Sequence, residues 1–304
     1  MTGDYILCGL RVRSTLAMPE LFPWRGDDRQ PDVEISFEPI EEPAEAPIFI
    51  RTFSKLWADG TYILELDNVG RFFVGSGRVI KVNPAPGAQE SELRLFTLGT
   101  CLGILCHQRG LYPLHASSVN IDGGAVLFAG DSGKGKSTIA AALGARGHTL
   151  LADDISVVDA SVPHLLPAYP QRKLSPDSLE ALGLQHDGLE LIRPGTVKLR
   201  VPTRGSFDPS PIPLSAIFIL GGDMPGMVGE IQRLSVTHAL TNIMAMMFRQ
   251  ASGVRIQTEQ ALFKSITRIL QAAPVYLLSL GRGYPLTELD MLAERLEIHV
   301  RTRR

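Results

Sequence analysis

The sequence has few cysteines and no hydrophobic segment long enough to cross a membrane. Its three cysteines, Cys8, Cys101 and Cys106, are an odd number and lack the spacing of a zinc site or a disulfide framework. Such cysteine usage favours a reducing compartment. No run reaches the roughly 18 to 20 apolar residues that a membrane-spanning helix needs, and the first residues lack the pattern of a secretory signal. The sequence therefore predicts a cytoplasmic protein that does not associate with membranes.

A strong excess of charge of either sign is also missing. The formal net charge is −2, so no basic field points to nucleic acid as a partner. Hydrophobic residues make up 44% and charged residues 20% of the chain, as in ordinary globular proteins. No asparagine is followed by lysine, so the Asn-Lys-x-Asp base reader of GTPases is absent. The function must therefore be sought in local motifs.

Two regions of the chain differ in how apolar and polar residues alternate. Residues 1–85 alternate apolar and polar side chains, most clearly over 32–39 and 61–82, and are predicted to be rich in β-strands. Residues 86–304 mix helical and strand patterns. The predicted fold class is therefore α/β, with α+β as the alternative, and the predicted boundary lies between residues 85 and 86.

Helices and strands alternate through the second region. Leucines at helical spacing predict a helix over 91–109, and residues 111–129 predict two strands that turn at 122–124. A helix over 136–146 and a strand over 148–154 follow, with a further strand expected over 155–160. Later apolar runs predict strands over 214–220 and 274–280, and amphipathic patterns predict helices over 235–250 and 285–296.

A glycine-rich loop carries the clearest chemical signal. Residues 130–137 fit the pattern G-x-x-x-x-G-K-[ST] in full, with a strand before and a helix after. Glycines let backbone N–H groups turn toward phosphate oxygens, and the helix N-terminus adds partial positive charge. Lys136 is expected to reach the β- and γ-phosphates and Ser137 to bind Mg²⁺. We expect the whole loop and the next residue to contact the nucleotide: Gly130, Asp131, Ser132, Gly133, Lys134, Gly135, Lys136, Ser137 and Thr138.

Two adjacent carboxylates follow the next strand. Asp153 and Asp154 are expected at its carboxyl end, the edge at which α/β sheets bind ligands. One of them could hold Mg²⁺ while the other takes a proton from a hydroxyl nucleophile. Asp223, after the apolar run 214–220, leaves open a motor or AAA-type ATPase, in which it would be the Walker B carboxylate. His115 is expected on the strand that pairs with the one feeding the loop, and there it could bind phosphate or orient a carboxylate.

The segment from Leu114 to Asp154 resembles the catalytic core of HPr kinase/phosphorylase. It contains a histidine, a Gly-Asp-Ser-Gly-x-Gly-Lys-Ser loop, an Arg-Gly-His tripeptide and an Ala-Asp-Asp end. The resemblance implies a P-loop domain related to phosphoenolpyruvate carboxykinase, with ATP and Mg²⁺ as cofactors. It implies phosphoryl transfer to serine, with Asp153 as general base, Asp154 on the Mg²⁺ side and His115 as a catalytic helper near the phosphates.

Departures from that family narrow the expected function. Thr138 stands where the bifunctional enzymes have glutamate, and residues 155–304 lack their later glycine-rich signature. The chain looks more similar to divergent HPr-kinase-like serine kinases, some of which tailor ribosomal peptides, including lasso peptides. We therefore expect a peptide or small-protein substrate with an acceptor serine, and the family tendency implies a homo-oligomer.

Downstream, four basic residues are candidates for phosphate contacts. They are Arg172, Lys173, Lys198 and Arg200, and Lys198 is the expected one because it lies in an alternating apolar stretch. Two other functions stay open. One is a nucleotide-binding regulatory module without transfer activity, and the other is a kinase of a small metabolite.

Overall fold

The N-terminal part of the chain forms one mixed sheet. The computed structural model describes residues 2–203, 207–221, 229–280 and 284–302. In the first sheet the strands lie in the order β3-β1-β2-β4-β9-β8-β7-β6-β5. Their bounds are β1 Gly3–Leu7, β2 Leu10–Ser14, β3 Phe22–Pro23, β4 Val33–Phe37, β5 Phe49–Arg51, β6 Ser54–Leu56, β7 Tyr62–Leu66, β8 Gly70–Gly75 and β9 Val79–Pro84. The predicted β-rich character of this region is confirmed.

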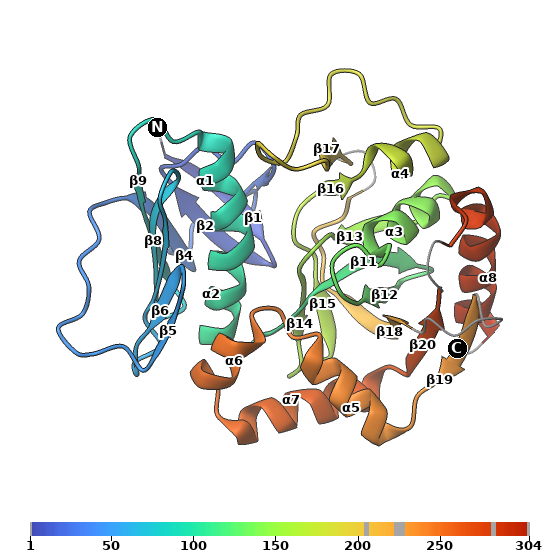
Figure 1. The fold of residues 1–304 in the computed structure, drawn as a ribbon. Coiled ribbons are helices and arrows are strands. Elements are labelled where there is room, and N and C mark those ends of the chain that lie inside the picture. Colours follow the sequence, from blue (N-terminus) through green and yellow to red (C-terminus); the bar gives the residue numbers. More distant parts are fainter. Residues whose placement is uncertain (1, 204–206, 222–228, 281–283, 303–304) are drawn as a thin grey trace.

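A helical segment packs against this sheet. It consists of α1 (Glu90–Phe96), a π-helical turn η1 (Thr97–Cys101) and α2 (Leu102–Gln108), where the sequence predicted one regular helix. Leu93, Leu98 and Leu102 share a core with residues of the first sheet, and Val157 and Tyr169 from later in the chain join the same core. In Figure 1 these helices lie between the first sheet and the rest of the molecule. The boundary at residues 85 and 86 stays a prediction.

The second sheet carries the phosphate loop. Its strands lie in the order β10-β14-β15-β18-β12-β11-β13, and β20 pairs with β18 and β19. The strands β12, β18 and β20 are parallel, whereas β11 pairs with β12 as an antiparallel hairpin. The bounds are β10 Tyr112–Leu114, β11 Ala116–Ile121, β12 Gly124–Ala129, β13 Thr149–Ala152, β14 Ser156–Asp159, β15 His164–Leu166, β18 Ile212–Gly221, β19 Glu230–Arg233 and β20 Val275–Ser279. The chain is therefore a mixed α/β protein, as predicted.

Helices cover both faces of this sheet (Figure 1). Along β12 the side chains alternate: Val126 and Phe128 pack in the core with α3 (Lys136–Ala145) and α8 (Leu289–Thr302). Leu127 points to the other face and packs in the core with α5 (Val236–Ala245) and α7 (Glu259–Ala272). β12 lies between β18 and β11 and is apolar on both faces, so the loop starts at the end of a buried strand inside the sheet.

Other elements differ from the predictions. Residues 235–250 were expected to form one helix, but α5 ends at Ala245 and α6 (Gln250–Ile256) begins after Arg249, whose φ is 54°. A hairpin of β16 (Gln171–Leu174) and β17 (Leu199–Pro202), the short helix α4 (Pro176–Ala181) and α7 were not predicted. The predicted helix over 285–296 is present as a 3₁₀ turn η3 (Leu286–Glu288) followed by α8.

The cysteines and the helices bear on the compartment and the membrane. The three cysteines are free thiols, and all of them are buried. No helix in the part of the chain described combines the length and apolar character that a membrane crossing requires.

Candidate phosphate-binding and catalytic site

The phosphate loop links β12 directly to α3. Gly133 and Gly135 have φ values of 83° and 88°, a region that side chains with a Cβ rarely adopt. Gly135 is the N-cap of α3, so the first free N–H groups of the helix face the loop. A glycine-rich turn that ends at a helix N-terminus is the arrangement that binds phosphate oxygens through backbone N–H groups. The predicted strand, loop and helix are therefore present.

Lys136 folds back over the loop. Its Nζ donates to the carbonyl oxygens of Gly130 at 2.7 Å and Asp131 at 2.9 Å, and it lies 3.0 Å from Nε2 of His115. Burial lowers the pKa of Lys136, although nearby carboxylates oppose the shift. Because ordinary backbone carbonyls hold the ammonium in this position, incoming phosphate oxygens can replace them.

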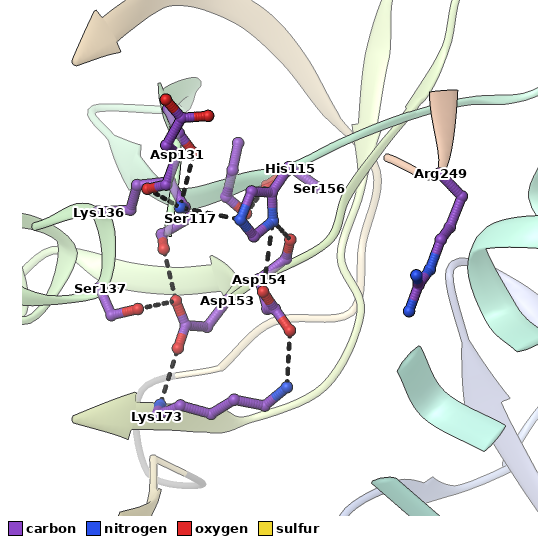
Figure 2. Close-up of polar contacts among 12 residues, drawn as sticks. His115, Ser117, Asp131, Lys136, Ser137, Asp153, Asp154, Ser156, Lys173 and Arg249 are labelled. Carbon is purple, nitrogen blue, oxygen red and sulfur yellow. Dashed lines mark hydrogen bonds and ion pairs between the residues drawn. The ribbon is translucent and has the colours of Figure 1, made fainter. Parts of the chain in front are cut away.

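His115 connects the loop to the acidic pair. Since Lys136 donates to Nε2, the proton of the neutral ring is on Nδ1, which donates to the backbone oxygen of Asp154 at 3.0 Å. Burial and then the charge of Lys136 lower the pKa of His115. At neutral pH the ring is therefore uncharged and holds the backbone of Asp154 beside the loop (Figure 2).

Asp153 is buried and accepts three hydrogen bonds from the protein. Its Oδ1 accepts hydrogen bonds from the hydroxyls of Ser137, at 2.7 Å, and Ser117, and its Oδ2 accepts from the backbone N–H of Lys173 at 2.8 Å. Only 3% of the residue is exposed. The carboxylate is therefore fixed against the serine of the phosphate loop (Figure 2).

Asp154 turns the other way. Its φ of 75° directs the side chain away from that of Asp153, and a third of the side chain is exposed. Its Oδ2 lies 2.8 Å from Nζ of Lys173, and its Oδ1 lies 3.3 Å from Nδ1 of His115. Burial alone would raise the pKa of Asp154, but the charge and hydrogen bond of Lys173, with His115 and Lys136, lower it to about 2.

A cavity of about 600 Å³ opens over these groups, a size typical of small-molecule sites. Most predicted site residues line it: His115, Ser132, Gly133, Lys134, Gly135, Lys136, Ser137, Thr138, Asp154 and Lys198. Gly130, Asp131 and Asp153 do not line it: Gly130 and Asp153 are buried, whereas Asp131 is exposed. Asp223 lies outside the described residues.

Sequence reasoning did not single out Lys173, although it named the residue among four basic candidates. Lys173 lines the cavity together with Lys198. Arg172 instead packs beside Gly144 of α3, and Arg200 donates to the backbone oxygens of Ser91 and Ile192. Nothing in the local sequence distinguishes Lys173 from Arg172, because only the pairing of β16 with its neighbours decides which side chain faces the cavity.

Thr138 stands where HPr kinase/phosphorylase has a glutamate, and its uncharged side chain contacts a serine of α4. Its Oγ1 lies 2.9 Å from Oγ of Ser178, which in turn lies 2.9 Å from Oγ of Ser175, the N-cap of α4. The start of α3 is thereby tied to α4. The Ser175-Pro176 pair is a helix-start signal that could have revealed α4 from the sequence.

The residues fit a magnesium ion bound together with phosphates. Ser137 and Asp153 present adjacent oxygen atoms, the donor type that Mg²⁺ prefers. The described residues contain no cluster of three or more His, Cys, Asp or Glu side chains arranged for a metal. A magnesium ion here would therefore take its remaining ligands from nucleotide phosphates and water, as in many phosphoryl-transfer sites.

Comparison with known proteins gives a family relationship for this part of the chain. Residues 111–184 match the family described as HPr Serine kinase C-terminal domain. These residues are HPr-kinase-related. The matched segment contains the phosphate loop, both aspartates and Lys173, so it supports a kinase or nucleotide-binding function.

The chain was also compared with solved structures and with curated protein sequences. A solved structure, the HPr(Ser) kinase/phosphatase from Coxiella burnetii, is similar over 62% of this chain and 98% of that chain, with 13% identity and a TM-score of 0.32. No curated protein sequence matched the chain.

Proposed function

We propose that this protein is an ATP- and Mg²⁺-dependent kinase that transfers the γ-phosphoryl group to a serine hydroxyl of a peptide or small protein. The observation that carries the proposal is the contrast between the two adjacent aspartates. Asp153 is tied to Ser137 of the phosphate loop, and Asp154 faces the cavity beside Lys173. The related family, which is named for serine kinases, supports serine as the acceptor.

The chain's own groups would divide the work as follows. The loop amides and the N-terminus of α3 hold the phosphates, and Lys136 moves from the carbonyls of Gly130 and Asp131 to the β- and γ-phosphate oxygens. Ser137 and Asp153 would hold Mg²⁺, which supplies neutralisation of phosphate charge when bound. His115 remains neutral and keeps the backbone of Asp154 in place.

Asp154 is the better candidate for the group that handles the acceptor. With a pKa of about 2 it is ionised at neutral pH, so it accepts a hydrogen bond from the serine hydroxyl and aligns the oxygen with the γ-phosphorus. The new oxygen–phosphorus bond forms as the bond to the β-phosphate oxygen breaks, ADP leaves, and the serine proton passes to Asp154 late in the transfer. This division reverses the one expected from the sequence, in which Asp153 was the base and Asp154 the Mg²⁺-side group.

The reason for the reversal is geometric. Both oxygens of Asp153 already accept hydrogen bonds from the protein, and its side chain is buried behind the loop. Asp154 lines the cavity, and its carboxylate has two contacts, with Nζ of Lys173 and Nδ1 of His115. A base must reach the proton that it accepts, and Asp154 meets that condition better.

Mass spectrometry tests the proposal. The purified chain is incubated with MgATP and, separately, with a serine peptide library and a pool of small metabolites. We expect phosphoserine on peptides and none on the same peptides with serine replaced by alanine. A Lys136→Met variant, which lacks the phosphate contact, should give no product. Phosphate gained by metabolites alone would contradict a peptide substrate, and ATP binding without any transfer would favour a regulatory module.

A further inference from the structure

The cavity has a second, apolar side that the proposed chemistry does not use. Beyond the phosphate loop it is lined by Ile139 of α3, Leu280 after β20, Tyr284, Leu286 of η3, and Leu289 and Leu292 of α8. Four of these six residues follow residue 281, outside the segment matched by the family. The side near Asp154 instead carries His115, Lys173 and Lys198. The cavity therefore has a charged region beside Asp154 and a mainly apolar region beside Leu280, and its wall also includes Ser175, Asp177 and Ser178.

The apolar side directly adjoins the loop. A Cβ built on Gly135 would lie 3.9 Å from Cδ1 of Leu280, so this leucine is next to the glycine that begins α3. Tyr284 is oriented by its hydroxyl, which donates to the backbone oxygen of Glu288 at 3.1 Å. Leu289 and Leu292 are buried and form the floor. The apolar side therefore begins next to the N-cap glycine of α3 and includes two buried leucines of α8.

The direction of a bound triphosphate follows from the polar contacts. Lys136 reaches toward His115, and Ser137 reaches toward Asp153, so the β- and γ-phosphates belong at that end. The α-phosphate then lies at the opposite end, near Thr138. Whatever group is attached to the α-phosphate must extend toward Leu280 and Tyr284.

We propose that this apolar side is the base-binding subsite of a nucleoside triphosphate, with Tyr284 and Leu286 contacting the purine. The inference rests on the proposed function, because it assumes that the loop holds the donor phosphates. A purine has two flat apolar faces, and contact with an aromatic ring favours its binding. The acceptor serine would then enter from the charged side, past Lys173 and Lys198, so donor and acceptor approach from opposite sides of the loop.

Comparing ATP with inorganic tripolyphosphate isolates the subsite. Titration calorimetry of the full chain with Mg²⁺ would measure both affinities in the wild type and in Tyr284→Ala and Leu286→Ser. We expect the wild type to prefer ATP, and each variant to bind ATP roughly tenfold more weakly while binding tripolyphosphate within about twofold of the wild type. Tyr284→Phe keeps the ring and should keep the ATP affinity.

A control on the same helix removes general effects. Met291 of α8 is 60% exposed and does not line the cavity, so Met291→Ser should change neither affinity. Equal affinity of the wild type for ATP and tripolyphosphate, or unchanged ATP binding in both Tyr284→Ala and Leu286→Ser, would overturn the subsite. If these variants selectively lose ATP binding, the subsite is supported. If the wild type then transfers no phosphate to serine, only the serine-kinase function is refuted.

Discussion

Replacing Lys173 by methionine should remove the main stabilising partner of Asp154. The lowering of the pKa of Asp154 from 3.8 to about 2 corresponds to about 2.4 kcal/mol in favour of the folded state when the carboxyl is ionised. A third of the side chain is exposed, so solvent screening reduces the contribution of the pair to about 1–2 kcal/mol. This coupling should be measurable as a departure from additivity between changes at the two positions.

The assay is a double-mutant cycle in the free energy of unfolding at pH 7, with Lys173→Met, Asp154→Asn and the double variant. Asparagine is chosen because it tolerates the left-handed backbone that Asp154 adopts, with φ of 75°. The same cycle with Lys198→Met, for which no ion pair with Asp154 is present in the described structure, should give little coupling. A Lys173–Asp154 coupling below about 0.3 kcal/mol, within the error of additive changes, would refute the reasoning.

The pH dependence of this pair has a definite sign. The pKa of Asp154 is lower in the folded state than its ordinary value, so the stabilisation is complete above pH 3.8 and is lost as the pH falls toward 2. The coupling should therefore be constant between about pH 5 and 8.

Three further predictions concern stability. Burial lowers the pKa of His107 to about 4, so acidification from pH 7 to 4 should cost about 3 kcal/mol of unfolding free energy, and thermal melting of His107→Gln should lack that part of the pH dependence. Gly70 has φ of 138°, and an added Cβ would lie 2.4 Å from the carbonyl oxygen of Asn83. Gly70→Ala should therefore lower the free energy of unfolding by more than about 2 kcal/mol. An unchanged melting temperature would contradict this. Ser117→Ala removes a buried donor to Asp153 and should cost about 1–2 kcal/mol in urea unfolding, whereas no loss would show that Asp153 is held by its other partners alone.

The site was predictable from the sequence where its geometry is local. The strand, phosphate loop and helix over 124–146 follow from consecutive residues, because glycines at 133 and 135 permit the required turns. The turn at Asp122 and Gly123, both with positive φ, was predictable for the same reason. His115 is only 21 residues from Lys136, and the intervening hairpin brings the two side chains together.

Features that depend on distant pairing were not predictable. The proposed roles of Asp153 and Asp154 depend on the φ of Asp154 and on Lys173, which lies on β16 of a hairpin that β17 completes. The break between α5 and α6 at Arg249 has no proline or glycine to signal it. Residues 246 and 248 there form backbone hydrogen bonds with residues 115 and 113, which are distant in the sequence. The apolar side of the cavity likewise combines Ile139 with Leu280 and residues 284, 286, 289 and 292, which are far from it in the sequence.

The central claim is that Asp154 handles the acceptor while the phosphate loop binds the donor. The most direct test is the rate of phosphoryl transfer to a serine peptide by Asp154→Asn at saturating MgATP, beside the wild type. We predict a loss of at least about 100-fold, with ATP affinity within about threefold of the wild type. Transfer by Asp154→Asn at the wild-type rate would contradict the account.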